Sequence, residues 1–206
     1  MDNTISKYLL FRTLYEPGIT FEVLAESEPS AWKVFSSYSV WLLLLPPVFS
    51  WIGAHNFGWR LGAAEPLMLE PATLTLISVA YFFTLLFGFY TTAVISRWMA
   101  STYGASTSFG RHAALITIVG QPLALASIAH LFPNVFFNII VMIPVMLWCM
   151  YLLYKGIPIA LETPPERGML MASSLVGWLL VAAVSLLGLT MGLWAAGFGP
   201  ALGVQL

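Results

Sequence analysis

The chain has 206 residues, of which 59% are hydrophobic and only 8% are charged, with a formal net charge of −1. Soluble domains carry about 25% charged residues, so this chain cannot cover a globular surface with solvated groups. A single cysteine excludes a disulfide-built secreted scaffold, 15% aromatic residues exclude disorder and the charge balance excludes nucleic-acid binding, which leaves an integral membrane protein.

A polar head over residues 1–33 comes first in the chain and carries four glutamates between residues 16 and 28. Residues 20–25 form a short amphipathic turn, for which Thr20 is the expected N-cap. Two compatible interpretations of the head stay open. It is an interfacial helix lying on the lipid headgroups, or a docking surface for a cytoplasmic partner.

Five apolar stretches follow the head, each about as long as the roughly 20 helical residues that cross a bilayer core. They cover residues 34–53, 72–95, 113–131, 135–154 and 169–196. Only residues 132–134 separate the third stretch from the fourth, which predicts a tight hairpin. We therefore expect an all-α integral membrane protein in which residues 34–206 form a bundle of five transmembrane helices.

The distribution of basic residues predicts the orientation of this bundle. Seven of the eight lysines and arginines lie before the first span, between the second and third, or between the fourth and fifth. Only Arg60, between the first and second spans, falls on the other side. Because cytoplasmic segments are enriched in Lys and Arg, we expect a cytoplasmic N-terminus and a periplasmic C-terminus.

The loop before the fifth span carries a helix-start signal. Thr163 is followed three residues later by Glu166, as in a capping box, and Pro164 suits the first helical position. The sequence thus predicts that the fifth helix begins near Pro164. The same loop is also a candidate for binding a partner.

Polar residues inside the spans are few and uncharged. Thr84, Gln121 and Ser185 lie near the middle of their spans, and Asn138 lies nearer the outside. Such side chains usually hydrogen-bond between helices, and the alternative is a shared hydrated cavity. Because no ionisable residue lies at mid-span, the pattern disfavours a proton-coupled pump.

Prolines interrupt three of the five spans, at Pro46 and Pro47, at Pro122 and at Pro144. Each removes a helix hydrogen bond, which predicts a kink. Interrupted helices build binding sites in transporters, but proline is also commoner in membrane helices than in soluble ones.

Small residues recur every four positions in two spans, which predicts faces where another helix backbone packs closely. The two sets are Ala80, Thr84, Gly88, Thr92 and Ser96, and Gly188, Gly192 and Ala196. The partner helix lies either in the same chain or in a second copy.

The sequence contains no arrangement typical of catalysis. Its one aspartate is Asp2, and phosphate-binding glycine loops, CxxC pairs and HExxH are absent. We expect no enzyme, no catalytic residue and no cofactor. The outer face holds one set of side chains that a divalent metal could use, although nothing in their spacing requires it: His55, Glu65, Glu70 and His130.

Several motifs in order carry a family resemblance. They are Trp51-Ile52-Gly53 with Phe57-Gly58-Trp59, then Gly120-Gln121-Pro122, then Tyr151-Leu152-Leu153-Tyr154-Lys155-Gly156-Ile157-Pro158. With the five-span plan, they resemble the Yip family of membrane proteins, named for interaction with Ypt/Rab GTPases, and most of all its bacterial YohC-type inner-membrane branch. The resemblance implies five helices, a cytoplasmic N-terminus, an inner-membrane location and no catalytic residues. Eukaryotic relatives bind Rab GTPases through a long head, whereas this head is short.

Two hypotheses for function follow. The first is a non-enzymatic protein that binds other membrane proteins or itself through its cytoplasmic face, with these candidate residues: Tyr154, Gly156, Pro158, Thr163, Pro164 and Glu166. The alternative is a small transporter, channel or lipid-handling protein whose path runs past Pro46, Pro47, Thr84, Gln121, Pro122, Asn138 and Pro144.

Overall fold

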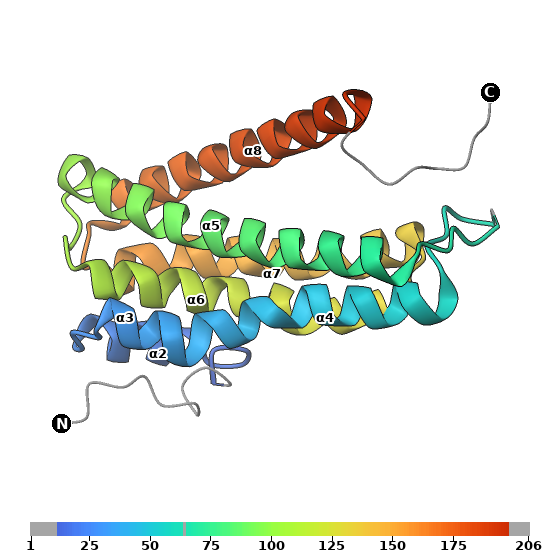
Figure 1. Cartoon of the computed structure of the whole chain (residues 1–206). Helices are drawn as coiled ribbons and strands as arrows, with labels where there is room; N and C mark the ends of the chain where they lie inside the picture. Colours follow the sequence, from blue (N-terminus) through green and yellow to red (C-terminus); the bar gives the residue numbers. More distant parts are fainter. Residues whose placement is uncertain (1–11, 64, 198–206) are drawn as a thin grey trace.

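The computed structural model describes residues 12–63 and 65–197, and the elements along them are helices, joined by turns and two isolated β-bridges. Five of the helical segments are long and apolar enough to cross a membrane (Figure 1). They cover Ala31–Phe57, Pro71–Tyr103, Phe109–Leu131, Val135–Ala160 and Pro165–Leu193. The prediction of an all-α protein with five membrane-length helices is confirmed.

The first and third of these segments are composite. The first joins α3 (Ala31–Val34), a π-helical turn η1 (Phe35–Ser39) and α4 (Val40–Phe57). The third joins α6 (Phe109–Ala126) to a 3₁₀ turn η2 (Ser127–Leu131). The second, fourth and fifth are single helices, α5 (Pro71–Tyr103), α7 (Val135–Ala160) and α8 (Pro165–Ala195).

The prolines and the hairpin fall as the sequence suggests. Pro46 and Pro47 lie inside α4, Pro122 inside α6 and Pro144 inside α7, and each helix continues past them. The hairpin between the third and fourth spans is confirmed, and the side chain of Asn134 caps α7 there by accepting a hydrogen bond from the Phe137 N–H at 3.1 Å.

The two ends of the bundle differ in what they hold (Figure 1). We name as the head end the one that contains α2 (Pro17–Ala25), the α5–α6 turn and the α7–α8 turn. The opposite end, named the far end, contains the α4–α5 loop and the α6–α7 turn. Of the described basic residues, Arg60 lies at the far end and the others lie at the head end: Arg12, Lys33, Arg97, Arg111, Lys155 and Arg167. Residues 1–11 of the predicted head lie outside the described residues.

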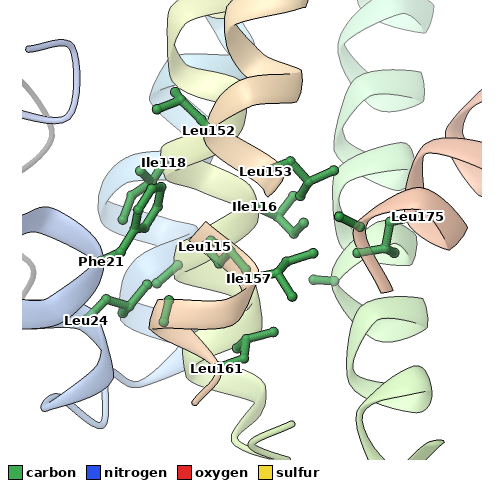
Figure 2. Close-up of a cluster of buried hydrophobic side chains, with 14 of the residues drawn as sticks. Phe21, Leu24, Leu115, Ile116, Ile118, Leu152, Leu153, Ile157, Leu161 and Leu175 are labelled. Atoms are coloured by element: carbon green, nitrogen blue, oxygen red, sulfur yellow. The ribbon is translucent and has the colours of Figure 1, made fainter. Parts of the chain in front are cut away.

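A tightly packed hydrophobic core occupies the head end (Figure 2). Phe21 and Leu24 of α2 point into it and are at most 1% exposed. Side chains of α6, α7 and α8 complete the core, among them Leu115, Ile118, Leu152, Ile157 and Leu175. Phe21 and Leu24 of α2 therefore pack on protein, whereas Ile19 and Val23 of the same helix are 38% and 40% exposed, so contact of α2 with the lipid headgroups stays a prediction.

The start of α2 also differs from the prediction. The helix begins at Pro17, and Thr20 is a fully buried residue within it, so Thr20 is not the N-cap. Proline suits a first turn because that turn leaves its N–H groups without helical partners. The signal for the helix start was thus Pro17 and not the later threonine.

The second half of α8 has a different environment from the rest of the bundle. Its first turns pack on α5 and α7, and the remainder diverges from the other helices (Figure 1). Between Leu179 and Leu193, large apolar side chains such as Val184 and Leu187 are exposed by 40% to 70%. A methyl group added at Gly188 or Gly192 meets nothing within 4 Å.

Candidate functional site at the head end

Two glycines allow the head to approach the spans closely. A Cβ atom on Gly156 would lie 2.7 Å from the ring of Phe21 and 2.8 Å from Leu115 Cδ1. A Cβ atom on Gly110, at the start of α6, would lie 1.7 Å from the carbonyl oxygen of Pro29. Neither position has room for a side chain, so the most specific sequence motif serves first to seat the head.

Pro158 and Thr163 connect the last turn of α7 to its neighbours. Pro158 packs closely on Gly168: a Cβ atom added to Gly168 would lie 2.6 Å from the Cγ atom of Pro158. The buried Thr163 hydroxyl donates to the carbonyl oxygen of Tyr103 at 2.8 Å, which joins the α7–α8 turn to the end of α5. The predicted start of the fifth helix is confirmed to within one residue, at Pro165, but this hydroxyl is directed to α5.

Arg111 holds three segments together. Its guanidinium lies 2.9 Å from a carboxylate oxygen of Glu28 in the head and forms a second ion pair with Glu162 after α7. Its Nε donates to the carbonyl oxygen of Ser27 at 3.0 Å, and the Ser108 hydroxyl donates to Glu28 at 2.6 Å. Because the Arg111 side chain is only 10% exposed, this network fixes the head to α6 and to the α7–α8 turn.

In the sequence, Arg111 counts only as one of the positive charges that predict the orientation. A signal for its role was available, because Arg111 stands in the first turn of a helix, where the helix dipole disfavours a cation. Such a position calls for nearby carboxylates, and Glu28 and Glu162 supply them.

His112 forms a second buried polar contact beside Arg111. Its Nε2 lies 2.8 Å from the carbonyl oxygen of Ser106 and its Nδ1 lies 2.7 Å from the Ser96 hydroxyl. A carbonyl oxygen only accepts, so Nε2 carries a proton and donates it to Ser106. The imidazole therefore joins α5, the α5–α6 turn and α6.

The remaining residues of the predicted interaction face are more accessible. Tyr154 is half-buried, with its hydroxyl 2.9 Å from that of Ser173, while Pro164 and Glu166 are exposed. Gly156 and Thr163 are buried and contact other parts of the same chain. The surface that a partner can reach at this end thus includes Tyr154, Pro164 and Glu166.

The predicted mid-span polar residues do not hydrogen-bond to one another. Thr84 faces outward, and its hydroxyl donates to the Ala80 carbonyl oxygen of its own helix at 2.8 Å. Gln121 is buried, and its Oε1 has no hydrogen-bond partner among the described residues. Asn138 accepts at 2.6 Å from His130 near the α6–α7 turn and donates to Phe132.

The histidines of the outer face are engaged separately. His55 stacks on Trp51 with ring centroids 4.7 Å apart, and His130 pairs with Asn138. Within residues 12–63 and 65–197, no three His, Cys, Asp or Glu side chains gather as a metal site requires.

Comparison with known proteins adds the following findings. The Yip1 domain family model matches residues 11–198 of the chain. Inner membrane protein YohC of Escherichia coli strain K12 is 27% identical over 182 residues, which cover 88% of this chain and 93% of that protein. The YohC protein of Escherichia coli O6:H1, strain CFT073, gives the same identity and coverage. No solved structure matches the chain.

Proposed function

The chain belongs to the Yip1 domain family and is a multi-pass inner-membrane protein, and from this premise we propose that it acts by binding other membrane proteins or a second copy of itself, without catalysis. In this proposal the head end lies in the cytoplasm. Six of the seven described basic residues are at the head end, which is the distribution expected of a cytoplasmic side.

The observation that carries this proposal is the second half of α8, which projects from the bundle (Figure 1). In a bilayer, apolar side chains alone give no preference for protein over lipid, and helices associate mainly where small residues let their backbones approach. Gly188 and Gly192 form such a face, and nothing in the described residues covers it. This half of α8 is therefore a binding surface for a transmembrane helix.

The head end offers a second surface, outside the hydrocarbon. The carboxylates of Glu22, Glu26 and Glu166 are exposed and form no ion pair with any residue that the structure describes. Arg111 and the two glycines hold the head against the spans. A basic segment of a cytoplasmic partner would find carboxylates here, on α2 and at the start of α8, that no described basic residue pairs with.

Photocrosslinking in native membranes tests this proposal. A photoreactive residue in place of Leu187 on α8 should trap the same protein repeatedly, whereas one in place of Ile140 on α7 serves as a lipid-facing control. Both positions are well exposed, Leu187 by 62% and Ile140 by 70%. Gly188→Leu should abolish the crosslink at Leu187, because a bulky side chain prevents close helix approach. Equal, random products at the two positions would contradict the proposal.

A path through the bundle is the second candidate function, and one observation favours it. Gln121 is 3% exposed and its Oε1 lacks a partner in the described part of the chain, although buried polar groups are normally satisfied. A water molecule or solute bound at this point would supply the missing donor. Flux through proteoliposomes that Gln121→Leu abolishes would support this candidate, and the absence of flux in the unmodified protein would reject it.

A further inference from the structure

An apolar cavity of about 290 Å³ lies at the head end, away from the predicted site residues. Trp32 and Phe35 of the first span form one wall, Phe89, Tyr90 and Ala93 of α5 form another, and Phe109 begins the α6 wall. Three lining side chains carry a polar atom: Ser39, whose hydroxyl is paired with that of Thr117 at 2.8 Å, and Trp32 and Tyr90, whose rings supply an indole N–H and a phenol hydroxyl. The other lining residues are apolar, so the cavity offers a ligand mainly apolar contact.

The wall that contains Phe35 and Ser39 is an unusual turn. These residues begin and end the π-helical turn η1, a form that occurs in well under 1% of residues and appears frequently at functional sites. The turn connects α3 to α4, at the point where the first span leaves the head. The π-helical turn therefore supplies two of the residues that line the cavity.

The cavity opens on the outer surface of the bundle. Trp32 is 73% exposed and Tyr90 is 52% exposed, although both line it. Ala93 lies in the last third of α5, so the cavity is near the head-end boundary of the membrane. Lipid tails are the apolar material that surrounds such an opening.

A cation without an acidic partner stands beside this opening. The guanidinium carbon of Arg97 lies 5.8 Å from the ring centroid of Phe109, which lines the cavity. Within residues 12–63 and 65–197, no carboxylate forms an ion pair with Arg97 or with the exposed Lys33 next to Trp32. Arg111, by contrast, has two such partners.

We infer that this cavity binds one anionic phospholipid, with part of an acyl chain among the aromatic side chains and the phosphate on Arg97. Arginine is well suited to phosphate because its donors match the phosphate oxygens in pairs. The volume lies near the lower limit of the about 300–1,000 Å³ typical of small-molecule pockets, which suits one part of a chain and not a whole lipid. This inference does not depend on the proposed partner binding.

Native mass spectrometry of the full-length, delipidated protein in mild detergent tests the headgroup contact. Phosphatidylglycerol should bind at least fivefold more strongly than phosphatidylethanolamine with the same chains. Arg97→Gln should remove this preference, whereas Arg167→Gln, which changes another exposed arginine at the head end, should alter binding by less than twofold. Equal binding of the two lipids, or equal effects of the two substitutions, would overturn the inference.

Filling the cavity tests the acyl-chain contact. Ala113→Phe places a ring in the α6 wall and should weaken the binding of both lipids at least tenfold. Ala183→Phe, on the exposed part of α8, should leave the binding of both lipids unchanged. Photoreactive phosphatidylglycerol with the reactive group on its acyl chain gives an answer even if Ala113→Phe fails to fold. In the unmodified protein it should label residues 31–39, 89–93 or 109–113. Labelling confined to other segments would overturn the inference. So would a dimer of this chain in which the second copy covers the cavity and prevents labelling there.

Discussion

The head end and the second half of α8 both contain glycines and large apolar side chains, yet their packing is opposite. At the head end, Phe21 and Leu24 are buried, and Gly110 and Gly156 leave no room for a methyl group. On α8, Gly188 has no neighbour within 4 Å of an added Cβ. Glycine therefore has two uses here, a close internal contact at one end and an open helix face at the other.

This contrast separates what holds the fold together from what is left for binding. The most specific residues of the sequence, around Gly156 and Pro158, are used largely within the chain. The open face of α8 carries a simple pattern of small and aliphatic residues that has no internal partner. Matched substitutions in the two regions test this division.

The largest expected difference is between Phe21→Ala and Leu187→Ala. Phe21 is fully buried, and removing a buried aromatic ring costs about 3–5 kcal/mol, while Leu187 is 62% exposed and its truncation should cost little. Denaturant titration in mixed detergent micelles, followed by circular dichroism, measures the free energy of unfolding. Limited proteolysis should show release of the head in Phe21→Ala only. Similar losses in the two variants would break the comparison.

A smaller difference is expected between Gly110→Ala and Gly188→Ala. The new methyl group at position 110 would collide with the Pro29 carbonyl oxygen, and overpacking of this kind costs about 1–3 kcal/mol. At position 188 the same change meets nothing and should stabilise the helix by up to about 1 kcal/mol. The same titration measures both, with the unmodified chain as reference. Destabilisation by Gly188→Ala would show that α8 packs closely in the monomer.

The smallest difference is expected between Thr163→Val and Thr84→Val. Both remove a hydroxyl that donates at 2.8 Å, but Thr163 connects the α7–α8 turn to α5, whereas Thr84 bonds within its own helix and is exposed. Loss of the buried hydrogen bond should cost about 0.5–1.5 kcal/mol. Thr84→Val should change the free energy of unfolding by close to zero. Thermal unfolding of the two variants, measured side by side, tests this difference. A loss at Thr84 equal to that at Thr163 would indicate a partner for Thr84 outside the described contacts.

The sequence predicted the five helices well because long apolar stretches identify spans directly. It underestimated their lengths, as when the second span was expected at 72–95 and α5 runs to Tyr103. Hydropathy reports the part of a helix that meets hydrocarbon. Helical hydrogen bonding continues past that part, into polar residues such as Arg97, and hydropathy carries no signal for it.

The contacts at the head end could not be predicted from the sequence. The motif that ends at Pro158 does mark the head end, but spacing alone could not show that Gly156 receives Phe21 from 135 positions earlier in the chain. Contacts of this kind depend on how the helices are arranged in space. The partners of Arg111 were missed for the same reason, since they come from opposite sides of it in the sequence.

Because α2 packs on α7, the folding steps of this protein follow a fixed order during synthesis. Phe21 leaves the ribosome long before Ile157, and the 136 positions between them take roughly 7–27 s at about 5–20 residues per second. Throughout that interval the apolar face of α2 has no completed groove, so membrane insertion of the fourth span must precede docking of the head. A nascent chain arrested before α7 would therefore keep Phe21 and Leu24 open to chaperones or to the membrane surface.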